Sequence, residues 1–418
     1  MAPSPPAHQP VGGGYLGAGF SIVKIVMTMM VRDEADIIEA VLEHHRRQGV
    51  DHILVTDNGS VDGTREALER FAQSGFVTVW DDPVHRKQQS ETVTRMARLA
   101  ATEYGADWVI NADADEFFVA ADEASTLRDE LRRIDEAVQY VTVQVVNLTG
   151  APAVDGTGLQ RLIYRDRRSA QRLVSAGIPF HPTGDAIHRG HAEVSVSQGN
   201  HFVSAPNWGD PVPEPRIEVL HLPWRSWAQY ERKVRNTGES YRANPDLEPS
   251  PRHHGMQDFR RLEQGRLEET YVAKHPLPDE IAELAYVGEL VEDRRLAHLA
   301  EQTPELVVRD LLYVSDRQAQ LARDGRRFTA IEAEYERRLQ DLRDSLESVH
   351  GSLHVAMLAV AEGKTHIDQR DEQIADLRRQ LDAAHRRFAV RLANRLSKYL
   401  APVRGAGRGR DAIGRQAD

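Results

Sequence analysis

The chain has 418 residues, no cysteine and a net charge of −11. Its length suits one large catalytic domain with an extension, or two to three domains, and its 40% hydrophobic content is enough for a real core. The acidic balance argues against general binding of nucleic acid. The lack of cysteine excludes disulfides, thiolate metal sites and cysteine nucleophiles, and it is compatible with a cytoplasmic protein.

The N-terminal part contains no segment that we interpret as crossing a membrane. Residues 1–19 are rich in Pro and Gly and predict a disordered lead-in. The apolar tract 15–31 is interrupted by Lys24 and runs directly into Arg32-Asp33-Glu34, unlike a membrane span or a signal peptide. Its second half therefore predicts a first buried strand.

Apolar runs then alternate with helical periodicity. Asp33 can cap the first helix and Gly49 can close it. Strands are expected at 22–31, 52–56, 76–80, 108–112 and 140–148, with helices between them at 33–49, 62–73, 88–104 and 125–137. This order predicts an α/β fold with a mostly parallel sheet covered by helices on both faces. In such sheets ligands gather at the carboxyl ends of the strands.

Polar clusters stand at those strand ends. Asp113 and Asp115 follow the apolar strand 108–112, and carboxylate oxygens at this spacing are suited to Mg²⁺ or Mn²⁺, which leave coordination positions open for a diphosphate. The alternative is a solvated turn, which the buried strand before the pair and Phe117-Phe118 after it disfavour. The second cluster, Asp57-Asn58-Gly59-Ser60, can hydrogen-bond a nucleobase edge, but its Asn-Gly is also an ordinary turn.

The chain after Gly150 is less regular. Residues 151–225 mix short strands with five histidines and predict a lobe or flaps on the acceptor side. A helix is expected at 226–242, a Pro-rich loop at 243–256 and a helical stretch at 279–325 with a break at Thr303-Pro304.

From about residue 328 onward an apolar residue recurs every seven positions, from Leu339 to Phe388, with a second, weaker series beside it. This pattern predicts a coiled coil over 328–395 that drives self-association into a homo-oligomer. The alternative is a long amphipathic helix folded back on the enzyme. The basic tail at 396–418 predicts peripheral contact with an anionic membrane surface, against the alternative of a soluble, disordered tail.

Three segments together carry a family resemblance. They are Met30-x-Arg32-Asp33-Glu34-Ala35-Asp36, Asp57-Asn58-Gly59-Ser60-x-Asp62-Gly63-Thr64 and Asp107-Trp108-Val109-Ile110-x-x-Asp113-x-Asp115-Glu116-Phe117. In this order they resemble a family-2-like glycosyltransferase with the GT-A fold, from the bacterial branch whose metal motif reads Asp-x-Asp-Glu-Phe. The resemblance extends through Gln198-Gly199-Asn200-His201 and His221 to Lys233, and predicts a catalytic domain at 20–270 followed by a helical segment at 271–327.

The resemblance implies a nucleotide-sugar donor, usually linked to UDP, a Mn²⁺ or Mg²⁺ cofactor, and transfer with inversion. Asp57 would contact the base, Asp113 the ribose or base, and Asp115 the metal. The expected metal ligands are Asp113, Asp115, His221 and His201. The expected nucleotide-sugar contacts are Arg32, Asp33, Glu34, Asp57, Asn58, Asp113, Arg225 and Lys233.

Inversion also needs a carboxylate base for the acceptor hydroxyl. Asp115 is expected to act in catalysis through the metal, and Asp185 and Asp210 are the candidates for the base. For both His201 and His221, the alternative to a metal ligand is a structural histidine that forms hydrogen bonds. The acceptor remains open among a glycan, a lipid-linked molecule and a protein.

Two rival functions follow from the same residues. A nucleotidyltransferase would need a Gly-rich, basic phosphate loop after the first strand, whereas Arg32-Asp33-Glu34-Ala35 is acidic and lacks Gly. A non-catalytic scaffold carrying the coiled coil would not need the intact Asp113-x-Asp115 pair.

Overall fold

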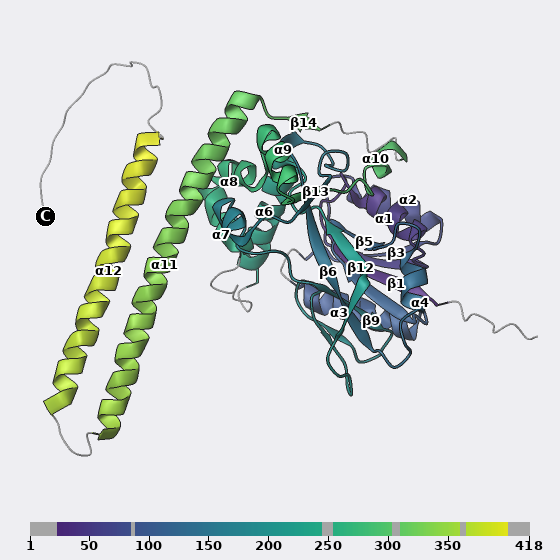
Figure 1. Ribbon diagram of the computed structural model, residues 1–418. Helices are drawn as coiled ribbons and strands as arrows, with labels where there is room; N and C mark the ends of the chain where they lie inside the picture. The colour runs from purple at the N-terminus through teal and green to yellow at the C-terminus, as the bar shows by residue number, and fades with distance from the viewer. Residues whose placement is uncertain (1–22, 85–87, 245–253, 303–309, 360–364, 400–418) are drawn as a thin grey trace, which may run out of the picture. The chain divides into compact units, whose positions relative to one another are not determined.

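The computed structural model describes residues 23–84, 88–244, 254–302, 310–359 and 365–399, and the chain divides after Thr329 into two compact units. The expected lead-in, the break at Thr303-Pro304 and the tail beyond residue 399 lie outside the described residues. The first unit contains the sheet and the helices around it (Figure 1).

The strands of the first unit occupy the predicted positions and several others. Their bounds are β1 (Ile25–Val31), β2 (His52–Asp57), β3 (Val77–Asp81), β4 (Trp108–Ala112), β5 (Glu116–Ala120), β6 (Tyr140–Thr149), β7 (Ala153–Asp155), β8 (Tyr164–Asp166), β9 (Asp185–Arg189), β10 (Ser195–Val196), β11 (Val203–Ser204), β12 (Val212–His221), β13 (Leu290–Glu292) and β14 (Leu311–Leu312).

The main sheet has the order β13-β8-β6-β9-β4-β1-β2-β3, with β12 pairing β6 and β5. Strands β4, β1, β2 and β3 are parallel, as the alternation of strand and helix predicts. Beyond β4 the sheet is mixed, because β9 runs antiparallel to both β4 and β6 while β12 is parallel to β6 and antiparallel to β5. The α/β class is confirmed, and the parallel arrangement is concentrated in the N-terminal half.

The helices of the first unit surround this sheet. Their bounds are α1 (Ile38–Arg47), α2 (Thr64–Gln73), α3 (Gln89–Thr102), α4 (Leu127–Arg132), α5 (Ala170–Ser175), α6 (Trp227–Arg242), α7 (His254–Glu263), α8 (Leu267–Lys274), α9 (Pro278–Tyr286) and α10 (Leu299–Gln302).

Strand β1 shows how the sequence builds three layers. Its side chains alternate between the two faces of the sheet, as they do in every strand. Ile25, Met27 and Met29 pack in one apolar cluster with residues of α1 and α2, whereas Val26 packs in another with residues of α3. Both faces of β1 are therefore buried, which explains its continuous apolar sequence.

Two predictions about the later chain are wrong. The expected helical stretch at 279–325 contains the strands β13 and β14, and its helices are α9, α10 and the start of α11 (Ser315–Ala359). The expected loop at 243–256 already contains the first turn of α7, which starts at His254. Helices α6, α7 and α8 and the start of α11 share an apolar cluster that includes Tyr271, which is fully buried.

The second unit contains the rest of α11 and α12 (Thr365–Tyr399). Tyr335 and Phe388 contact each other with ring centroids 4.6 Å apart, so α11 and α12 run antiparallel within one chain. Phe388 belongs to the predicted heptad series and Tyr335 extends the second one. Self-association through this hairpin remains a prediction. Among the described helices, none has both the length and the apolar content to cross a membrane.

Candidate active site

The carboxyl ends of β1, β2 and β4 meet at one edge of the sheet, where the structure has two adjoining cavities. Val31 pairs with Asp57, and Met29 pairs with Ala112, so the segments that follow these strands emerge side by side. One cavity has a volume of about 1740 Å³ and the other about 180 Å³. Five residues line both cavities, namely Gln88, Gln89, Asp113, Lys233 and Thr237.

Most of the predicted nucleotide-binding residues line the smaller cavity. These are Arg32, Asp33, Glu34, Asn58, Asp113 and Lys233, together with Asp115. Two members of the predicted set do not line it. The Asp57 carboxylate accepts hydrogen bonds from the amide (3.0 Å) and hydroxyl (2.6 Å) of Ser60, so it stabilises its own turn. Arg225 is fully buried behind the cavity wall.

Asp33 connects the β1 end to two other segments. It adopts φ +57° and its carboxylate accepts hydrogen bonds from the Val61 amide (2.8 Å) and the Asn236 side chain (2.9 Å). The prediction that Asp33 caps the first helix is therefore wrong, since α1 starts only at Ile38. Asp62 accepts a hydrogen bond from the Thr64 amide at the start of α2 (3.1 Å), while the N-cap of that helix is Gly63.

Asp115 is the most enclosed acid of the site, with 1% of its surface exposed. Its Oδ2 accepts a hydrogen bond from Lys233 Nζ and lies 3.6 Å from His221 Nε2 and 3.9 Å from Arg225 Nη1. Burial acts to raise the pKa of Asp115, but the charges of Lys233, His221 and Arg225 outweigh it and hold that pKa well below its usual range. The Asp115 carboxylate is therefore ionised.

Arg225 binds two further carboxylates beside this cluster. Its guanidinium donates to both oxygens of Asp36 (2.7 and 3.0 Å) and to Glu34. Burial raises the pKa of Glu34 to about 7, against the opposing charge of Arg225. The planar guanidinium of Arg225 binds both carboxylates, and these hydrogen bonds fix the positions of Asp36 and Glu34.

Asp113 and Glu116 face the larger cavity. Asp113 Oδ1 accepts hydrogen bonds from Gln89 (2.7 Å) and Asn200 (3.1 Å), and the Asp113 amide donates to Glu116 Oε2 (2.9 Å). Burial raises the pKa of Glu116 well above its usual range, and the charges of Asp185 and Asp113 add to this. Glu116 thus holds its proton more tightly than a free glutamic acid does.

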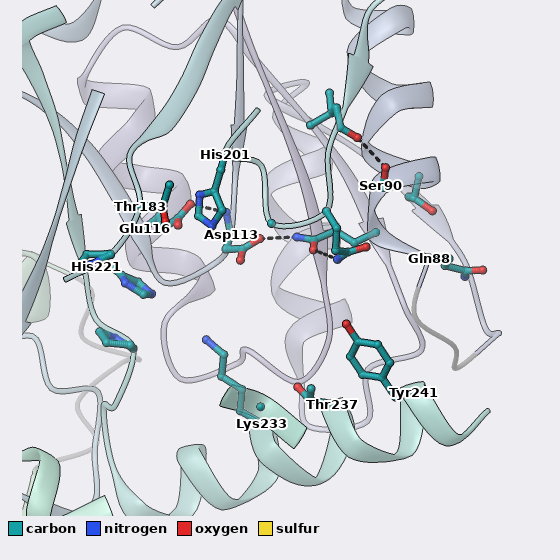
Figure 2. Close-up of a pocket in the computed structure, with 18 of the residues that line it drawn as sticks. Gln88, Ser90, Asp113, Glu116, Thr183, His201, His221, Lys233, Thr237 and Tyr241 are labelled. Carbon is teal, nitrogen blue, oxygen red and sulfur yellow. Dashed lines mark hydrogen bonds between the residues drawn. The ribbon is translucent and has the colours of Figure 1, made fainter. Parts of the chain in front are cut away.

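His221 ends β12 and joins two neighbouring strands. Its Nδ1 lies 2.9 Å from Asn147 Oδ1, and it pairs with Asn147 of β6 and with Glu116 of β5. Figure 2 shows His221, His201, Glu116 and Asp113 around the cavity. The hydrogen bond to Asn147 leaves Nε2 as the nitrogen nearer to Asp115.

The hairpin of β10 and β11 carries the predicted Gln198-Gly199-Asn200-His201 segment at its tip. Gly199 and Asn200 have φ of +83° and +63°, and this turn directs Asn200 to Asp113. His201 Nδ1 lies 2.8 Å from Asp185 Oδ1 rather than toward Asp115. The structure therefore brings His201 and Asp185 together.

The two candidate bases lie in different surroundings. Asp185 begins β9 and is fully buried. Because β9 is antiparallel to β4, its first residue lies at the carboxyl end of β4, near Asp113 and Glu116. Asp210 is exposed and lies outside the lining of both cavities, so it has no position from which to act as the base.

Helix α6 supplies the predicted Lys233 and four cavity-lining residues that the sequence analysis did not name, namely Arg232, Asn236, Thr237 and Tyr241. Lys233, Thr237 and Tyr241 recur every four residues and point into the cavity (Figure 2). Arg232 and Asn236 face the smaller cavity and bind the carbonyl and the carboxylate of Asp33. The regular spacing of these polar residues along 226–242 could have predicted that this face of the helix lines a site. Gln89 of α3, which the sequence analysis did not name, donates a hydrogen bond to Asp113.

The donor atoms at the cavity junction suit a divalent cation only after a rearrangement. Among the residues that the structure describes, no three His, Asp or Glu side chains are placed to hold a metal ion together. The Lys233 ammonium lies directly against Asp115 Oδ2, where a cation bound by Asp115 would lie. Asp113, Asp115 and His221 nevertheless provide the oxygen and imidazole donors that Mn²⁺ accepts.

Comparison with known proteins agrees with this architecture. Residues 26–153, which span β1 to β7, match the model of glycosyltransferase family 92. The match covers less than a third of the chain. The comparison with curated proteins gave no match.

The similar solved structures include two bacterial enzymes. Glucosyl-3-phosphoglycerate synthase from Mycobacterium tuberculosis, in complex with Mn²⁺, UDP and glucosyl-3-phosphoglycerate, is 19% identical with a TM-score of 0.24, over 44% of this chain and 63% of the synthase. S. aureus TarS 1–349 with UDP-GlcNAc is 11% identical with a TM-score of 0.31, over 68% of this chain and 92% of TarS.

The N-terminal part of the chain is therefore similar to a glycosyltransferase family, and its mixed α/β sheet is consistent with a GT-A-like fold. The matching model is that of family 92, and the resemblance to family 2 remains a prediction.

Proposed function

We propose that this protein is an inverting glycosyltransferase that moves a sugar from a nucleotide-sugar donor, preferentially one linked to UDP, to a hydroxyl acceptor. One observation carries the proposal: Asp113 and Lys233 stand at the junction of a small and a large cavity at the carboxyl ends of the parallel strands. The small cavity fits the nucleotide side of the donor, and the large cavity fits the acceptor.

The residues around Asp115 suit a diphosphate leaving group. Negative charge develops on the diphosphate as the glycosidic bond breaks, and preorganised cations at that point stabilise the transition state. Lys233 is held at Asp115, and its pKa is raised because the charges of Asp115 and Glu34 outweigh burial, so it is a permanent cation. His221 Nε2 lies 3.6 Å from the same Asp115 oxygen that contacts Lys233.

A Mn²⁺ or Mg²⁺ ion bound by Asp113, Asp115 and His221 would neutralise further charge on the departing diphosphate. Binding of the ion would require Lys233 to give up its contact with Asp115 Oδ2. The ion would then take over from Lys233 the role of compensating the buried charge of Asp115.

Two other functions remain as outcomes of the experiment. A nucleotidyltransferase would use the same cavities with a nucleoside triphosphate. A scaffold would bind no nucleotide, and its α11–α12 hairpin would be the functional part. The cytoplasmic location, homo-oligomerisation through the hairpin and membrane contact by the tail belong to the proposal and need separate tests.

The experiment measures thermal stabilisation of the full chain by UDP, GDP and UTP, each with and without Mn²⁺. We expect UDP with Mn²⁺ to stabilise the protein by about 2.7 kcal/mol at one hundred times its Kd. Asp115→Ala should abolish the effect. Asp81→Asn is the matched control, because Asp81 also ends a parallel strand but is exposed and lies outside both cavities.

Each alternative has its own result. Stabilisation and turnover only with UTP would favour a nucleotidyltransferase. No stabilisation by any nucleotide at millimolar concentration would reject the transferase and favour the scaffold. If wild type and Asp115→Ala respond equally, the nucleotide does not bind at this cavity junction.

A further inference from the structure

His201 and Asp185 form a pair that neither the donor side nor the proposed metal ligands use. His201 lines the larger cavity, where the acceptor would lie, and 35% of its side chain is exposed. Asp185 is fully buried, and its Oδ1 lies 2.8 Å from Nδ1 of His201.

The hydrogen bond fixes which nitrogen of His201 faces the acceptor. With the carboxylate oxygen of Asp185 as the acceptor, Nδ1 carries the proton and donates it in this hydrogen bond. Nε2 then holds the free electron pair. Among the described residues, none hydrogen-bonds to Nε2. A Cβ at Gly199 would lie 3.2 Å from this atom, so the glycine leaves room beside it.

Asp185 is held in place by the backbone. It pairs with Val143 of β6 at the start of β9. Its second oxygen, Oδ2, has no hydrogen-bond partner in the part of the chain that the structure describes.

We propose that His201 is the general base that activates the acceptor hydroxyl, with Asp185 as the residue that positions it. This inference rests on the proposed glycosyl transfer and replaces Asp185, the candidate from sequence, with a histidine–aspartate pair. The buried Asp185 cannot itself reach an acceptor in the cavity, whereas His201 lies at the cavity surface.

The step balances without a further reactant. The acceptor O–H bond breaks and its proton passes to His201 Nε2. The acceptor oxygen forms a bond to the anomeric carbon from the face opposite the leaving group, and the bond from that carbon to the diphosphate oxygen breaks. The electron pair of this bond leaves with the nucleoside diphosphate, and the imidazolium is stabilised by Asp185.

In the part of the chain that the structure describes, the charges that act most strongly on His201 are those of Asp185 from β9 and Asp113 from the turn after β4. The hydrogen bond to Asp185 raises the pKa of His201 above its usual 6.5, against the opposing effect of burial, and the charges of Asp185 and Asp113 add to the rise. The unprotonated base should therefore require a pH above 6.5.

The first experiment follows hydrolysis of UDP-glucose, UDP-galactose and UDP-N-acetylglucosamine with Mn²⁺, with water as the acceptor. His201→Gln should lower kcat for the hydrolysed donor by about 10²–10⁴-fold, with the Kd for UDP changed less than threefold. Asp185→Asn should lower kcat by about tenfold or more and move the acid limb of the pH–rate profile to lower pH. His191→Gln, outside both cavities, is the matched control and should retain wild-type kcat.

A second experiment separates a base from a merely structural histidine. Azide needs no proton removed, so it should restore turnover of His201→Gln and yield a glycosyl azide of inverted configuration. It should not accelerate Asp115→Ala. NMR of the wild-type imidazole nitrogens should show the proton of neutral His201 on Nδ1.

The outcomes distinguish this inference from the proposed function. If wild type binds UDP and hydrolyses a donor while His201→Gln does so equally fast, the histidine–aspartate pair is rejected and the transferase stands. A proton on Nε2, or a slow His201→Gln enzyme that azide leaves slow, also rejects it. If wild type neither binds UDP nor turns over any donor, the proposed function fails first and the base fails with it.

Discussion

Replacing Arg225 by leucine tests whether its buried ion pairs with Asp36 and Glu34 stabilise the folded protein. Arg225 is fully buried, and its guanidinium is bound by Asp36 and Glu34. Arg225→Leu leaves both carboxylates without this partner. Breaking a buried ion pair by removing one side costs about 3–5 kcal/mol, which for a domain of this size corresponds to a fall in Tm of roughly 6–20 °C.

The pH dependence of this loss is the sharper part of the prediction. Glu34 has a folded-state pKa of about 7, raised by burial from the usual 4.5, so its contribution to stability is complete below pH 4.5 and is lost as the pH rises through 7. Arg225 offsets part of that loss. Arg225→Leu should therefore cost more at pH 8 than at pH 5, by about 1.4 kcal/mol for each unit that the Glu34 pKa rises.

Urea midpoints and thermal unfolding at pH 5 and pH 8 measure the effect. Arg235→Leu is the matched control on α6, because Arg235 and its partner Glu231 are exposed and such pairs contribute about 0–1 kcal/mol. A loss below about 1 kcal/mol at pH 8, or an equal loss at both pH values, would refute the reasoning.

Three further substitutions test packing and capping. Gly238→Ala should lower the free energy of unfolding by about 1–3 kcal/mol, because the new Cβ would lie 2.1 Å from the ring of Phe259; an unchanged urea midpoint would contradict this close packing of α6 on α7. Gly351→Ala, where no atom lies within 4 Å, should instead stabilise α11 by about 0.5–1 kcal/mol, seen as slower amide exchange in that helix. Thr126→Ala should cost about 1 kcal/mol and speed exchange of the Asp129 amide, since it removes the capping box of α4; unchanged exchange would mean that the cap is redundant.

The first half of the fold was predictable because its signals are local. The sequence of 22–31 is largely apolar because β1 is buried on both faces. The polar clusters follow their strands within a few residues. Hydrophobic periodicity reports such features directly. The carboxylates of Asp113 and Asp115 could be placed at the edge of the sheet for the same reason.

The second half was less predictable because its contacts are distant in sequence. Strand β9 is only five residues long, and its antiparallel pairing with β4 joins residues about 80 positions apart. The sequence pattern of 151–225 does not predict that Asp185 lies near Glu116, or that the turn between β10 and β11 places His201 against Asp185. Likewise, a heptad pattern predicts that a helix packs against another helix, but it does not predict whether that second helix belongs to the same chain.

Helix α6 forms part of the wall of both cavities through Lys233 and Thr237. A ligand that shifted the helix while filling one cavity would alter the affinity of the other, and thermodynamic linkage requires the same factor in the reverse direction. The affinities of the two cavities would then be reciprocally coupled, and a change as remote as the packing of α6 on α7 would uncouple them without touching either ligand.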